Sequence, residues 1–197
     1  MSTEFSLSSV SSVVESSSLR DDQVKLGLWM FLATVTMLFA AFTSAYVVRR
    51  SGSDWRHVAL PSLLWLNSLV LAASSAAVEA ANARGAQGRW RSSVAAMLLA
   101  LVLGIVFLAG QVAAWRQMMA AGVYLPTSPH SSFFFMLTGA HAAHVVAALV
   151  VLAWGSVATT SGAADPRAWA ARMSLCRTFW HYLGAVWLFL FALVTLY

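Results

Sequence analysis

Five long apolar segments run through the sequence, and short polar stretches separate them. Each segment is long enough to cross a bilayer as a helix, because about 20 apolar residues span the hydrocarbon core. We therefore predict an all-α integral membrane protein, a bundle of five transmembrane helices. The predicted spans are residues 26–48, 60–82, 93–115, 133–158 and 175–197.

The stretches between the spans contain residues that interrupt helices or favour the membrane surface. Gly52 is expected to end the first helix, and Pro61 suits the opening turn of the second. The sequences "GVYLPTSPHSS" and "TTSGAADPRAW" carry the prolines that bound the fourth span. Aromatic rings that prefer the headgroup level lie near the span ends: Trp55, Trp90, Tyr124 and Trp169.

The composition agrees with a membrane protein and argues against a soluble one. Charged residues make up 10% of the 197 residues and hydrophobic residues 60%, with a mean hydropathy of +0.74. A soluble domain carries about 25% charged residues, so this chain has too few to cover a globule. The net charge of +5 does not indicate a nucleic-acid interface, because the basic residues are scattered between apolar runs. The single cysteine, Cys176, excludes a disulfide framework.

The N-terminal segment differs from the rest of the chain. Its sequence "MSTEFSLSSVSSVVESSS" is rich in serine, acidic where charged, and lacks the basic n-region of a secretory signal peptide. We predict that residues 1–24 form a disordered cytoplasmic tail. Residues 25–197 then form the five-helix transmembrane domain.

The basic residues on alternate sides of the spans predict the orientation in the membrane. Eight Lys or Arg fall on the side that holds the N-terminus, and four fall on the other side. Cytoplasmic loops of membrane proteins carry the excess of Lys and Arg. We therefore predict a cytoplasmic N-terminus and a C-terminus, at Tyr197, outside.

Polar residues within the spans are the candidates for function, because each must find a partner in the membrane. His141 and His144 lie three residues apart in "SFFFMLTGAHAAHVV", and this spacing places them on one face of a helix. The full set in or near the spans is Asn67, Glu79, Gln111, His141, His144 and His181.

The residues alone leave three interpretations open. A haem or metal site would use His141, His144 and His181, which can reach a common depth, although no carboxylate lies near them in the sequence. Proton conduction would use Glu79, the one carboxylate within an apolar run, which can instead snorkel to the surface or pair with Arg84. The third interpretation is structural, with the polar side chains forming hydrogen bonds between helices.

Four motifs carry these residues through the spans. They are "LPSLLWLNSLVLAASS", "LGIVFLAGQVAAW", "SSFFFMLTGAHAAHV" and "FWHYLGAVWLFLF". In this order and spacing they resemble subunit III of the haem-copper terminal oxidases, the cytochrome c oxidase family. The resemblance extends from Leu26 to Tyr197 and implies the short, five-helix bacterial form, located in the bacterial cell (inner) membrane.

The resemblance implies an accessory subunit in aerobic respiratory electron transport that holds no haem or copper of its own. Such a subunit packs against the catalytic subunit I and through it subunit II, stabilises the catalytic subunit, binds phospholipid and supports proton uptake. We therefore assign no catalytic, cofactor-binding or metal residues. Interhelical contacts are expected from Asn67, Gln111, His141, His144, Trp180 and His181. Proton or lipid contacts at the surface are expected from Glu79, Arg84, Arg89 and Arg91.

Two positions depart from the pattern of the resembled family. Many members carry a buried glutamate on the first of these five helices, where this chain has Val35. The family often has an aspartate three residues after the histidine of the Trp-His pair, where this chain has Gly184. These departures favour packing and lipid binding over direct proton handling. The alternatives are the similar accessory subunit of nitric oxide reductase and an independent haem-binding or transport protein.

Overall fold

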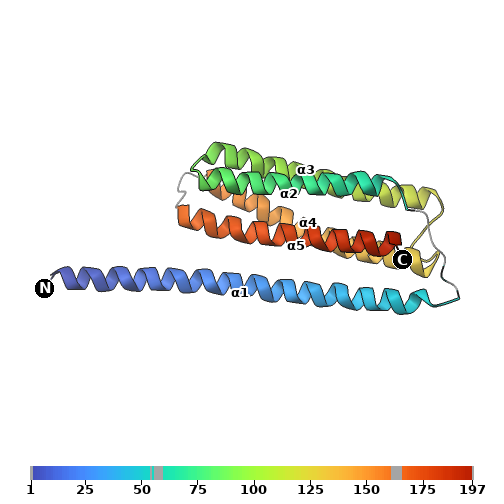
Figure 1. The fold of residues 1–197 in the computed structure, drawn as a ribbon, viewed down its shortest axis with the longest axis horizontal. Coiled ribbons are helices and arrows are strands. Elements are labelled where there is room, and N and C mark those ends of the chain that lie inside the picture. The colour runs from blue at the N-terminus through green and yellow to red at the C-terminus, as the bar shows by residue number, and fades with distance from the viewer. Residues whose placement is uncertain (1, 54, 56–59, 161–165, 197) are drawn as a thin grey trace. The chain divides into compact units, whose positions relative to one another are not determined.

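The computed structural model describes the backbone of residues 2–53, 55, 60–160 and 166–196, and the side chains of residues 23–53, 55, 60–157 and 169–196. Its helices are α1 (Ser2–Arg50), α2 (Leu63–Ala86), α3 (Trp90–Ala120), α4 (Pro129–Thr160) and α5 (Pro166–Leu196) (Figure 1). Each contains a segment long and apolar enough to cross a membrane: Gln23–Arg50, Leu63–Ala86, Trp90–Ala120, Pro129–Val157 and Trp169–Leu196. The prediction of five long apolar helices is confirmed.

Several helix boundaries differ from the predicted ones at prolines. The helices α4 and α5 begin at Pro129 and Pro166, two prolines predicted to lie in the connecting loops. Proline suits a first helical position because the first turn needs no N–H donor and the ring presets φ. Pro61 instead lies before α2, in a turn where its carbonyl accepts a 3.1 Å hydrogen bond from the amide of Leu64. The second helix therefore begins at Leu63, later than predicted.

The chain divides into two compact units, Met1–Met37 and Leu38–Tyr197. The first unit is the N-terminal part of α1, whose helix includes the Ser-rich residues predicted to be disordered. The side chains of residues 1–22 lie outside the described part of the chain. The disordered tail stays a prediction.

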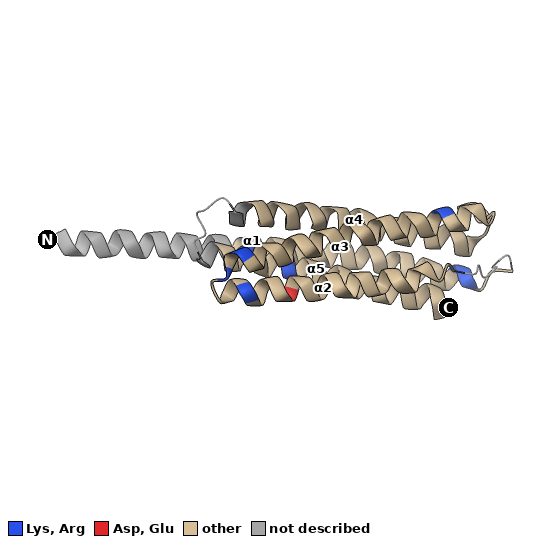
Figure 2. Ribbon diagram, turned by 90° about the horizontal axis from the view of Figure 1, so that it is seen from above, with Lys and Arg blue, Asp and Glu red and all other residues tan. Residues whose placement is uncertain are grey.

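In the second unit, the four helices α2 to α5 lie side by side (Figure 1). The helix α2 contacts α3 and α5, and α4 also contacts α3 and α5, so the four close into a ring. Gly88 and Gly122 follow α2 and α3 with φ of 71° and 78°, a left-handed conformation that glycine adopts without strain. Most charged positions in the described part of this unit lie near the helix ends (Figure 2).

The interior of the ring combines large aromatic side chains with small residues. Trp187 and Phe107 are fully buried and contact edge to face, with ring centroids 5.0 Å apart. Trp180 is also buried and packs on Gly104, where an added Cβ would lie 2.7 Å from the indole ring. A side chain at this glycine would displace the tryptophan, so the close approach of α3 and α5 depends on it.

Candidate functional site

Buried polar side chains join α2 to α3. The amide Nδ2 of Asn67 donates to the carbonyl of Phe107 at 3.0 Å, and the hydroxyl of Ser74 donates to the carbonyl of Ala100 at 2.9 Å. Ser93 of α3 donates back to a carbonyl of α2 at 2.8 Å. All three donors are almost completely buried. Asn67, one of the predicted contact residues, thus lies at the α2–α3 interface.

Two indole N–H groups donate hydrogen bonds that join α3 to α4 and α5 to α2. Trp115 of α3 donates to the hydroxyl of Thr138 of α4 at 3.0 Å. Trp187 of α5 donates to the hydroxyl of Ser68 of α2 at 2.9 Å. Since each hydroxyl also donates to a carbonyl one turn earlier in its own helix, both are fully used as donors.

His141 and Gln111 lie in the same interior and are each 1% exposed. The imidazole of His141 contacts the rings of Phe107 and Trp187, with centroids 6.0 Å and 5.3 Å away. None of the side-chain polar atoms of His141 or Gln111 has a hydrogen-bond partner among the described residues. His141 is therefore held by aromatic packing.

His144 contacts different neighbours from His141, although their spacing predicts a shared face. Its Nδ1 lies 2.7 Å from the carbonyl of Ala140, so Nδ1 carries the hydrogen of this bond. Its ring centroid lies 5.8 Å from that of Phe39 on α1. Positions three apart on a helix differ by about 60° in direction, which is enough to direct the two rings toward different helices.

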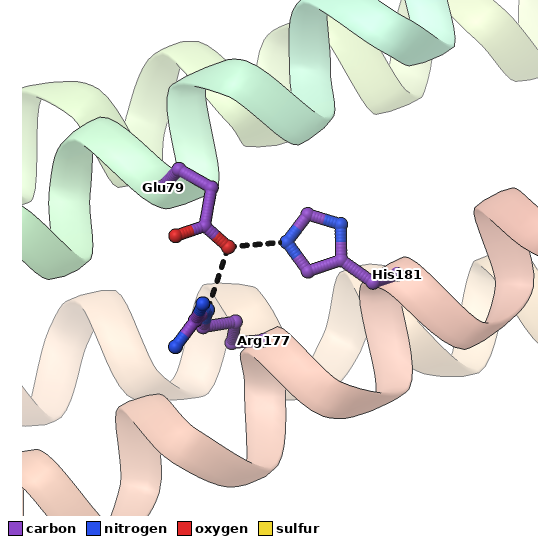
Figure 3. Close-up of polar contacts among 3 residues, drawn as sticks. All are labelled: Glu79, Arg177 and His181. Atoms are coloured by element: carbon purple, nitrogen blue, oxygen red, sulfur yellow. Dashed lines mark hydrogen bonds and ion pairs between the residues drawn. The ribbon is translucent and has the colours of Figure 1, made fainter.

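Glu79, Arg177 and His181 form an ionic cluster between α2 and α5 (Figure 3). Oε1 of Glu79 accepts hydrogen bonds from Nε of Arg177 and Nε2 of His181, each at 2.6 Å. Arg177 and His181 are four residues apart, so both leave α5 on the face toward α2. Because a carboxylate only accepts, Nε2 of His181 carries the hydrogen. The three side chains are 38–48% exposed, and the cluster is therefore open to its surroundings.

The ion-pair partner of Glu79 in the structure differs from Arg84, the partner considered from the sequence. Glu79 pairs with Arg177, not with Arg84. Arg84 follows Glu79 by five residues and is rotated by about 140° around α2, away from α5. Arg177 was not predicted as a site residue and entered only as one of the eight charges that set the orientation. Its spacing of four residues from His181 indicated a shared face of the helix, but not the partner on α2. The basic residues of the α2–α3 connection are half-buried or exposed: Arg84, Arg89 and Arg91.

A groove of about 360 Å³ extends from the ionic cluster along α2 and α5. At Gly184, where the resemblance leads us to expect an aspartate, an added Cβ would meet only the hydroxyl of Ser75, at 3.8 Å. Glycine thus leaves the groove open, and Glu79 supplies His181 with a carboxylate from the neighbouring helix. The lining residues are Ser68, Leu71, Ala72, Ser75, His181, Gly184, Ala185 and Leu188.

The five apolar helices and the hydrogen bonds between them define a multi-pass integral membrane protein. Among the described residues, no three His, Cys, Asp or Glu side chains are grouped so as to hold a metal ion. The family model for cytochrome c oxidase subunit III matches residues 13–197, and the chain belongs to this family.

Bacterial relatives cover nearly the whole chain. It is 28% identical to cytochrome c oxidase subunit 3 of Corynebacterium diphtheriae, over 90% of this chain and 89% of the relative. It is 27% identical to a probable cytochrome c oxidase subunit 3 of Mycobacterium tuberculosis, over 89% and 88%. It is also 27% identical to cytochrome bo(3) ubiquinol oxidase subunit 3 of Pseudomonas putida, over 87% and 84%.

Family membership makes the chain a multi-pass membrane subunit of a haem-copper terminal oxidase, of the cytochrome c or the bo(3) ubiquinol type. It functions in respiration in a complex with other oxidase subunits. Subunits of this family generally lack redox cofactors.

Proposed function

We propose that this chain is the accessory subunit III of a cytochrome c oxidase. It packs against the catalytic subunit I and through it subunit II, holds no haem or copper, and keeps the catalytic subunit active during aerobic respiratory electron transport. The observation that carries this proposal is the environment of the three intramembrane histidines. His141 packs between aromatic rings, His144 bonds to a carbonyl of its own helix, and His181 bonds to Glu79.

The proposed orientation has the N-terminus in the cytoplasm and Tyr197 outside, because eight of the twelve Lys and Arg fall on the N-terminal side. In this orientation α2 ends in the cytoplasm, and Glu79 lies in its cytoplasmic third. We also propose that the chain supports proton uptake, because the Glu79–His181 pair places two titratable groups in the cytoplasmic half of the bilayer.

Lipid binding is proposed at both ends of the helices. A hollow of about 1250 Å³ lies where the end of α1 meets the start of α4. Arg49 lines it together with serine and threonine hydroxyls and the ring of Phe133, a lining that suits a phospholipid headgroup and the start of its chains. At the other end, Arg84, Arg89 and Arg91 would each contribute about 1 kcal/mol of attraction to anionic headgroups.

The test is the activity of the purified oxidase with and without this chain during sustained turnover. The proposal predicts the same haem spectrum and the same initial rate, followed by faster loss of activity in the complex without the chain. Adding the chain back before turnover should restore the slower loss. Equal rates of activity loss in the two complexes would refute the accessory role.

A further inference from the structure

We propose that the groove between α2 and α5, with the ionic cluster at its end, is the docking surface for a transmembrane helix of another oxidase subunit, and that this helix presents a carboxylate to Arg177. This inference rests on the proposed function, because it requires that the chain assembles with a larger membrane subunit.

The depth of the ionic cluster in the bilayer indicates that this face is covered by protein or water and not by lipid tails. The 24 residues of α2 extend over about 36 Å, against about 30 Å for a hydrocarbon core. Glu79 lies seven residues before Ala86, about 10 Å from the end of the helix. With α2 centred in the bilayer, the backbone of Glu79 lies about 7 Å inside the hydrocarbon. Charged side chains at such depth face protein or water, because exposure to lipid tails is unfavourable.

The groove and the cluster hold polar atoms without partners among the described residues. Nε of Arg177 is bonded to Glu79, whereas its two Nη atoms have no acceptor in the described part of the chain. The hydroxyl of Ser75, which lines the groove, has no hydrogen-bond partner there either. The planar Nη pair of arginine matches the two oxygens of a carboxylate. The complementary partner therefore carries an acidic side chain at the depth of Arg177.

The lining of the groove favours a helix over a lipid chain. Ala72, Ser75, Gly184 and Ala185 are small, and small residues let the backbones of two membrane helices approach closely. An acyl chain could fill the apolar part of the groove, but it offers no acceptor to Arg177 and no partner to the hydroxyl of Ser75. A helix with polar side chains satisfies both.

Photo-crosslinking in the intact oxidase tests the docking surface. The photoreactive residue p-benzoylphenylalanine replaces Ala185 in the groove or, as a control, Ile105, which is 53% exposed on α3. Irradiation of the purified complex should join the Ala185 position to another oxidase subunit, identified by its mass, with several times the yield at Ile105. Adducts only with lipid, only within this chain or only with a second copy of it, or equal yields at the two positions, would overturn the proposal.

Charge variants test the partner's carboxylate. Arg177→Gln should lower several-fold the fraction of the chain that co-purifies with the haem-containing subunit. The control Arg116→Gln removes an exposed arginine of α3 that lies outside the groove and the ionic cluster, and it should leave this fraction nearly unchanged. Equal losses in both variants, or no loss in Arg177→Gln, would overturn this part. If the wild-type chain co-purifies with no haem-containing subunit, the proposed function itself fails. If the chain co-purifies with that subunit but crosslinks only to lipid, the proposed docking surface is refuted and the proposed function is not.

Discussion

Two adjacent serines on α2 allow a direct test of how buried hydroxyls stabilise the helix ring. Ser74 is fully buried and donates to the carbonyl of Ala100 at 2.9 Å. Ser75 points into the groove without a hydrogen-bond partner among the described residues. Ser74→Ala removes an interhelical hydrogen bond, whereas Ser75→Ala removes the same atom from a position where it bonds to nothing within the described part of the chain. The second variant is therefore a matched control for the first.

The expected effect follows from measured hydrogen bonds between membrane helices. Such bonds contribute about 0.6 kcal/mol on average and up to about 1.7 kcal/mol. The acceptor at Ala100 keeps the bond of its own helix, so the loss is limited to the interhelical bond. Ser74→Ala should therefore lower the free energy of unfolding by about 0.6–1.7 kcal/mol. This corresponds to a roughly three- to sixteen-fold change in the unfolding equilibrium.

The assay is reversible unfolding of the purified chain in mixed micelles, with the loss of helix followed by circular dichroism. Ser75→Ala should change the free energy of unfolding by less than about 0.5 kcal/mol, the range for substitutions that touch no special feature. Equal destabilisation by the two variants, or a larger effect from Ser75→Ala, would refute the assignment of stability to the buried hydrogen bond.

Three further substitutions can be measured in the same unfolding assay. Gly104→Val should destabilise the chain by about 1–3 kcal/mol, because its Cβ would lie 2.6 Å from Leu149 and 2.7 Å from Trp180; an unchanged free energy of unfolding would contradict the packing described for the interior. His141→Phe should be neutral or stabilising, since it replaces two buried ring nitrogens without partners in the described residues by carbon, and a loss above about 2 kcal/mol would show that the imidazole makes a bond. Glu79→Gln replaces the charged acceptor of the ionic cluster by a neutral one and should lower the free energy of unfolding by up to about 1.7 kcal/mol, the upper end of the range for polar contacts between membrane helices; a larger loss would show that the charge itself holds α2 to α5.

The length and apolar character of the five helices were predictable from the sequence, because a membrane span needs only a sufficient run of apolar residues. The starting points of α4 and α5 at Pro129 and Pro166 were not predicted. A proline is compatible both with a loop and with a first helical turn, so the residue type alone does not decide between them.

The candidate site was predicted only in part. The positions of Asn67 and His141 inside the helix ring agree with the rule that polar groups in membrane spans face other helices. The pairing of Glu79 with Arg177 could not be derived, because it depends on the rotation of α2 against α5. The spacing of residues along one helix gives no information about contacts between residues almost one hundred positions apart.

The visible spectrum of the native complex, recorded before and after this chain is dissociated from its partners, shows whether the chain is a cofactor-free accessory subunit. The oxidase would be purified from native membranes in mild detergent through a tag on this chain. We expect the haem absorbance to co-purify with the complex and to remain with the large partner subunit after dissociation. A haem band retained by the isolated chain would refute the cofactor-free role and would make His141, His144 and His181 candidate ligands.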